Sequence, residues 1–164
     1  MTTEAAILSH VMDKSRQLTN SYLELLKDVD PYRVFESEGR KLNSVFWIMA
    51  HMSVTENFLL LRCTGGEIVK IPWARQFGLG SVPSAKEDSP PMDEVKGFLT
   101  DVHEKSVRHI ATLNDAYLDE ANAMGFEFAG EKSIRSIIIH AIRHENGHGG
   151  HLGWLCKLHG IKTL

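Results

Sequence analysis

Hydrophobic residues recur every three or four positions in four long segments of the chain, with polar residues between them. This spacing predicts amphipathic helices. The predicted helices cover residues 4–28, 43–63, 92–115 and 131–158. Helices of this length bury their apolar sides most simply against one another. We therefore expect an all-α protein with the architecture of a four-helix bundle.

The residues between the predicted helices indicate three connections of different character. Residues 32–42 are polar, and residues 116–130 contain two glycines and a short strand-like piece. Residues 64–91 form a long connection between the second and third helices, rich in glycine and proline. Trp73 and Phe77 are large apolar residues that a protein rarely leaves in solvent. They predict that the long connection packs on the bundle, over a cleft.

Four of the nine histidines lie in the last predicted helix, at intervals of four, four and three residues. They are His140, His144, His148 and His151. Because a helix advances ~100° per residue, the four side chains share a stripe about 80° wide. Leu155 projects from the same side, so the stripe faces the rest of the protein. Neutral imidazole nitrogens bind divalent metals, and the row therefore predicts a metal site.

One helix readily supplies two ligands to an ion, at positions i and i+4, but a third would lie ~5 Å or more further along the axis. A ligand from a second helix is therefore expected. His51 is the one histidine of the predicted helix 43–63, which is apolar over most of its circumference and so should be buried. A buried imidazole needs a partner for each ring nitrogen, and a metal would provide one. The other histidines are expected on the surface or at the rim: His10, His103, His109 and His159.

Composition and charge reduce the number of protein classes to which this chain could belong. The net charge of −3 argues against nucleic-acid binding, which needs a clustered basic face. No run of 18 apolar residues predicts a membrane span, and the first residues do not resemble an export signal, so we expect a cytoplasmic protein. Cys63 and Cys156 lie inside helical patterns, where they are expected to be buried thiols. The length fits a single domain, residues 1–164.

Two motifs resemble those of one known family. The last helix contains His144-x-x-x-His148 followed by Gly149-Gly150-His151, and residues 43–51 end in His51. The two motifs resemble the metal-ligand motifs of the DinB/YfiT-like family, and they occur in the family's order and at its separation. Chain length, helix order and the long connection after the second helix fit as well, so the resemblance covers essentially the whole chain.

The resemblance implies a four-helix bundle that binds one divalent ion through His51, His144 and His148. His140 and His151 then line the pocket or contact the ligands. Many relatives carry Arg-Gly-Gln where this chain has Gly149, Gly150 and His151, so an anion contact made by that arginine is missing here.

The function expected from these features is that of a metal-dependent enzyme acting on a small molecule, of the thiol S-transferase or hydrolase type. Relatives include thiol-dependent transferases and isomerases, which implies a low-molecular-weight thiol as cofactor. Imidazole ligands suit zinc, nickel, iron and copper alike, and among these zinc or nickel is favoured, followed by iron. One alternative is a non-catalytic metal- or ligand-binding protein related to stress, with His140 or His151 as a fourth ligand. Another is a bundle without metal.

Few residues outside the histidines are candidates for chemistry. Glu56 and Glu145 are the carboxylates nearest the expected ligands in sequence, and either would serve as a general base or as a partner of a ligand histidine. His151 is a third candidate. Thr55 lies one turn after His51 and is placed to contact a metal-bound water. The apolar helix 43–63, together with the relatives, favours a homodimer.

Overall fold

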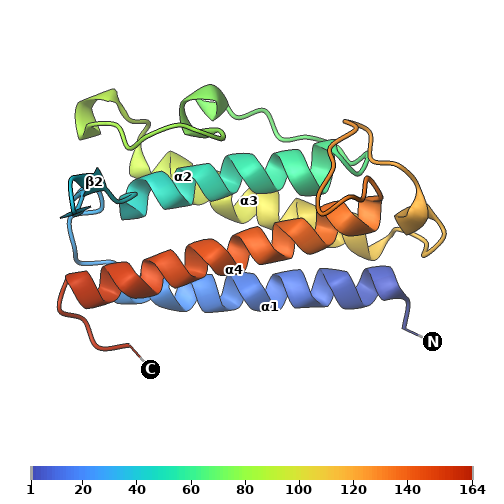
Figure 1. Ribbon diagram of the computed structural model, residues 1–164, viewed down its shortest axis with the longest axis horizontal. Coiled ribbons are helices and arrows are strands. Elements are labelled where there is room, and N and C mark those ends of the chain that lie inside the picture. Colours follow the sequence, from blue (N-terminus) through green and yellow to red (C-terminus); the bar gives the residue numbers. More distant parts are fainter. Residues whose placement is uncertain (1, 164) are drawn as a thin grey trace.

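Four long helices form the body of the protein. The computed structural model describes residues 2–163, and Figure 1 shows the helices packed side by side. The helices are α1 (Glu4–Leu25), α2 (Val45–Glu56), α3 (Met92–Ala111) and α4 (Ile134–Leu158). The prediction of an all-α four-helix bundle is confirmed. None of the described helices is long and apolar enough to cross a membrane.

The direction of the helices explains the long connection. α1 and α4 run one way along the bundle, and α2 and α3 run the other way (Figure 1). Because α3 begins at the end of the bundle where α2 also begins, the chain must return along the whole length of α2 before α3 can start. The connection contains two short 3-10 turns, η2 (Ala74–Phe77) and η3 (Lys86–Asp88).

Polar residues mark the starts of three helices. The hydroxyls of Thr3, Ser44 and Ser133 accept hydrogen bonds from backbone N–H groups three residues further on, in α1, α2 and α4 respectively. Each bond satisfies one of the N–H groups that a helix leaves free in its first turn. Local sequence therefore sets where these helices begin.

The second predicted helix is not α-helical to its end. After Glu56 it widens into a π-helical segment, η1 (Asn57–Arg62). The N–H of Cys63 accordingly donates to the carbonyl of Phe58, five residues earlier. Asn57 then holds the returning chain, because its side chain both donates to the carbonyl of Val69 and accepts from the Val69 N–H.

The first and last connections contain more structure than their composition suggests. Residues 32–42 include a small antiparallel hairpin, β1 (Glu36–Ser37) and β2 (Arg40–Lys41). Glu38 and Gly39 at its turn both have positive φ, 51° and 73°, as a tight hairpin requires. The hairpin was not predicted because its strands are polar and only two residues long. The strand-like piece expected within 116–130 corresponds to two isolated bridges, beside the 3-10 turn η4 (Tyr117–Asp119).

The buried core explains the apolar circumference of α2. Residues 45–53 are all buried, and Phe46 and Ile48 are among the least exposed side chains of the protein. The returning connection covers the side of α2 that the other helices leave free, with Trp73 and Phe77 buried against it as predicted. The apolar character of α2 is therefore accounted for within one chain, and it is no evidence for a dimer. Cys63 and Cys156 are buried free thiols, as expected.

Candidate metal centre

Three histidines from two helices converge on one point between α2 and α4. One ring nitrogen of each of His51, His144 and His148 lies within 4.8 Å of the others. The Nε2 atoms of His51 and His144 are 3.1 Å apart. Two imidazoles that bind one ion in tetrahedral geometry have nitrogens about 3.3 Å apart, given metal–nitrogen bonds of about 2.0–2.1 Å. The separation of His51 and His144 therefore fits two ligands of one divalent ion, and His148 lies close enough to be the third.

The returning connection fixes which nitrogen of His51 is free to bind. Nδ1 of His51 lies 2.7 Å from the backbone carbonyl oxygen of Phe77. A carbonyl can only accept, so Nδ1 carries the proton and Nε2 keeps its lone pair. That lone pair points at His144 and lies 3.3 Å from the hydroxyl of Thr55. The indole of Trp47 stacks on the same imidazole, with ring centroids 4.4 Å apart, and limits its rotation.

Burial keeps the three imidazoles neutral. It lowers the pKa of His51, and together with the neighbouring imidazoles it lowers the pKa of His144 to about 4 and of His148 to about 3. At neutral pH all three rings therefore hold a free lone pair, which is the form that binds a metal. Three neutral ligands would leave the full charge of a divalent ion uncompensated.

The two other histidines of the row lie outside the cluster. Nδ1 of His151 is 3.3 Å from Nδ1 of His148, so the exposed His151 contacts a cluster residue without belonging to the cluster. His140 stacks on Phe128, with ring centroids 3.6 Å apart, and packs α4 against the last connection. The structure thus separates a row of four into two cluster members and two neighbours.

The carboxylates of Glu56 and Glu145 point away from the cluster, toward α1. Arg16 donates from Nη2 to Glu56, at 2.7 Å, and from Nε to Glu145, at 2.8 Å. All three side chains are 3% exposed. Burial alone would raise the pKa of Glu145, but the hydrogen bonds and charge of Arg16 hold it below its ordinary value. As placed, both carboxylates are occupied with Arg16 and neither faces the point where the imidazoles converge.

His103 also belongs to this buried group, and its expected place on the surface or rim is wrong. Its Nδ1 lies 2.9 Å from Glu56, its Nε2 lies 3.4 Å from Asp13, and the residue is 8% exposed. The burial of His103 could not be predicted from the sequence, because its hydrogen-bond acceptors come from α2 and α1, far from His103 in the chain. His10 is exposed as expected, and the partly buried His109 bonds to Thr64.

Two parts of the site were not predicted from the sequence. Arg16 lies between Met12 and Thr19 at helical spacing, and both of these are buried. A charged residue on an apolar helix face is rarely buried unless it is paired, so the sequence did contain an indication of a buried ion pair at Arg16. The carbonyl of Phe77 had no signal of its own, because a backbone group that contacts a distant side chain leaves no trace in the residue pattern.

Comparison with known families agrees with the geometry. A model of the DinB superfamily matches residues 12–152, which include all four long helices in part or whole and every member of the histidine cluster. The chain belongs to the DinB superfamily. No curated protein matches it at a significant level. The resemblance inferred from the two motifs is thus confirmed at the level of the family.

Proposed function

We propose that this protein binds one divalent metal ion through His51, His144 and His148, and that it is a metal-dependent enzyme acting on a small molecule. The observation that carries the proposal is the convergence of three neutral imidazoles. Among the described residues, no fourth histidine, cysteine or carboxylate joins this group. A three-ligand site leaves room for water or substrate, whereas structural metal sites have four protein ligands.

The chemistry proposed is transfer to or from a thiol, or hydrolysis. A divalent ion on three neutral imidazoles lowers the pKa of a bound water or thiol and stabilises developing negative charge. Zinc or nickel is the proposed ion and iron the third choice, since imidazole ligands suit all three. A low-molecular-weight thiol is the proposed co-substrate. The hydroxyl of Thr55, beside the Nε2 of His51, is placed to hold a water or thiol near the ligands.

Metal analysis of protein purified without a histidine tag tests the binding. We expect about one zinc or nickel ion per chain, and no bound ion in His144→Ala. The exposed His10→Ala is the matched control and should keep its full metal content. A His144→Ala variant with full metal content would refute the ligand assignment.

A screen for activity separates the enzyme from a non-catalytic metal-binding protein. The metal-loaded protein is offered a panel of electrophiles with several small thiols, and a panel of esters and amides without them. Thiol consumption or hydrolysis that disappears in His148→Ala supports the enzyme. Full metal content without turnover of any compound favours the binding protein.

A further inference from the structure

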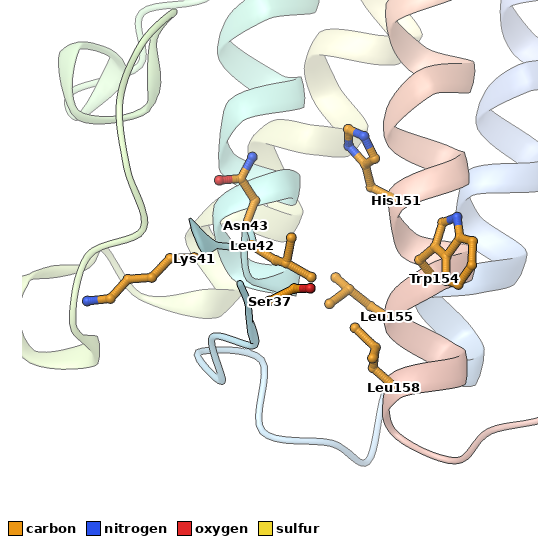
Figure 2. A pocket seen from close by; sticks show the side chains of 8 residues that line it. All are labelled: Ser37, Lys41, Leu42, Asn43, His151, Trp154, Leu155 and Leu158. Atoms are coloured by element: carbon orange, nitrogen blue, oxygen red, sulfur yellow. The ribbon is translucent and has the colours of Figure 1, made fainter. Parts of the chain in front are cut away.

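A pocket opens beside the cluster, between the small hairpin and the last turns of α4. It has a volume of about 560 Å³. We call it the hairpin pocket, and Figure 2 shows the side chains that line it. They are Ser37, Lys41, Leu42, Asn43, His151, Trp154, Leu155 and Leu158. A volume of this size is in the range of sites for small molecules.

The hairpin pocket adjoins the histidine cluster through one residue. His151 forms part of its wall, and Nδ1 of His151 lies 3.3 Å from Nδ1 of His148. Along α4, the wall continues for two further turns, through Trp154 and Leu155 to Leu158. A molecule lying in the pocket would therefore extend along α4 from its last turn to within one residue of the cluster.

Apart from Lys41 and His151, the side chains that line the pocket are apolar or carry no ionisable group. Figure 2 shows the side chains of Leu42, Leu155 and Leu158 directed toward the space between the hairpin and α4. Lys41 also lines the pocket, but in the same view its side chain extends away from α4 and from the three leucines. Trp154 is 65% exposed, a large apolar surface left open at the edge of the pocket.

We propose that the hairpin pocket binds the apolar part of an uncharged small molecule, and that this molecule is the substrate of the neighbouring site. An alkyl or aryl group would lie against Leu42, Leu155 and Leu158, and the reactive group would pass His151 toward the cluster. The substrate class is therefore a neutral compound with an apolar body and one reactive end. The role of the reactive end rests on the proposed function. The binding of the apolar body is inferred from the pocket alone.

Binding of N-phenylnaphthylamine, an uncharged dye that fluoresces in apolar surroundings, tests the pocket. Leu158→Glu and Leu42→Glu each place a charge at a partly exposed wall position, 43% and 37% exposed. We expect each to weaken dye binding by about tenfold or more, since burying a leucine-sized apolar contact has that effect. Ile139→Glu is the matched control, because Ile139 is on the same helix, is also 43% exposed and is not part of the pocket. Circular dichroism confirms that each variant is folded.

Competitors of the same length then test the charge. We expect hexanol to displace the dye at lower concentration than hexanoate or hexylammonium. Hexanoate or hexylammonium as the best competitor would overturn the proposal of a neutral ligand. Dye binding that neither leucine variant changes would overturn the pocket itself.

Two further readouts keep this proposal separate from the proposed function. Zinc content is measured for every variant, and Leu158→Glu should keep the zinc of the unchanged protein. Absence of zinc from the unchanged protein would refute the metal site, while dye binding would still report on the pocket.

Addition of octanol should shift the imidazole NMR signals of His151, and unshifted signals would refute the link between the pocket and the cluster.

Discussion

Arg16 on α1 binds Glu145 on α4 through both carboxylate oxygens, with hydrogen bonds of 2.8 Å and 3.0 Å. The same guanidinium donates to Glu56 on α2 and to the carbonyl of Leu99 on α3. One buried side chain thus connects all four helices. Glu145 follows His144 directly in α4. The connection therefore also fixes the position of His144 and His148 along the bundle axis relative to α2.

Replacing Arg16 should strongly destabilise the fold. Arg16→Met would leave Glu56 and Glu145 buried without their cation, and breaking a buried pair in this way costs about 3–5 kcal/mol. Urea unfolding of the metal-free protein measures the change. Arg108→Met is the control, because Arg108 is 67% exposed and its ion pair with Glu104 lies on the surface. A loss below about 1 kcal/mol in Arg16→Met would show that the buried network is not stabilising.

The metal-free protein should lose stability on mild acidification. The unfolded chain binds a proton on each histidine below its ordinary pKa of about 6.5, whereas folded His144 and His148 resist protonation until about pH 4 and pH 3. Between these limits the unfolded state binds more protons, so the free energy of unfolding falls as the pH falls. Above about pH 6.5 both histidines are neutral in the folded and in the unfolded chain, so they cause no loss of stability there.

Thermal melts of the metal-free protein at pH 7.5 and pH 5 check this effect. We expect a lower melting temperature at pH 5, and a smaller difference between the two pH values in a His144→Gln, His148→Gln double variant. Other groups that titrate in this range remain in the double variant, which makes it the internal control. An equal difference in both proteins would contradict the assigned cause.

His151 should affect metal affinity without being a ligand. Its Nδ1 lies against Nδ1 of His148, and a partner on the second nitrogen of a ligand histidine orients the ring. We expect His151→Ala to weaken zinc binding by about 10–100-fold, as is usual for such partners. His151→Gln, which can still hydrogen bond, should recover part of the loss. His140→Ala should have a smaller effect, since His140 packs on Phe128. Competition with a zinc indicator measures all three.

The expected homodimer stays a prediction, and the structure suggests a different surface for it. α1 exposes four apolar side chains at helical spacing on one side: Ile7, Val11, Leu18 and Leu25. If this stripe is the contact between two copies, Leu18→Glu should convert a dimer into a monomer. Size-exclusion chromatography with light scattering measures the mass, with Leu79→Glu, at an exposed loop position, as control. A monomer of the unchanged protein at high concentration would refute the dimer.

The sequence by itself determined the positions of the four long helices and the histidines from which the site is built. The hydrophobic period marked all four long helices, because a helix that buries one side must carry apolar residues every three or four positions. His51 and the row on the last helix were recognisable because imidazole is uncommon on buried faces. The choice of His144 and His148 from that row needed the family resemblance, since helical spacing alone left the pair open.

Only the tertiary structure decided what surrounds the cluster. The proton on Nδ1 of His51 depends on the carbonyl of Phe77, 26 residues away. Glu145 lies next to His144 in the chain but is turned toward Arg16, because consecutive residues of a helix point about 100° apart. The hairpin pocket forms where residues 37–43 meet the last turns of α4. Such contacts join residues far apart in the chain, and the pattern of neighbouring residues contains no information about the distance between them.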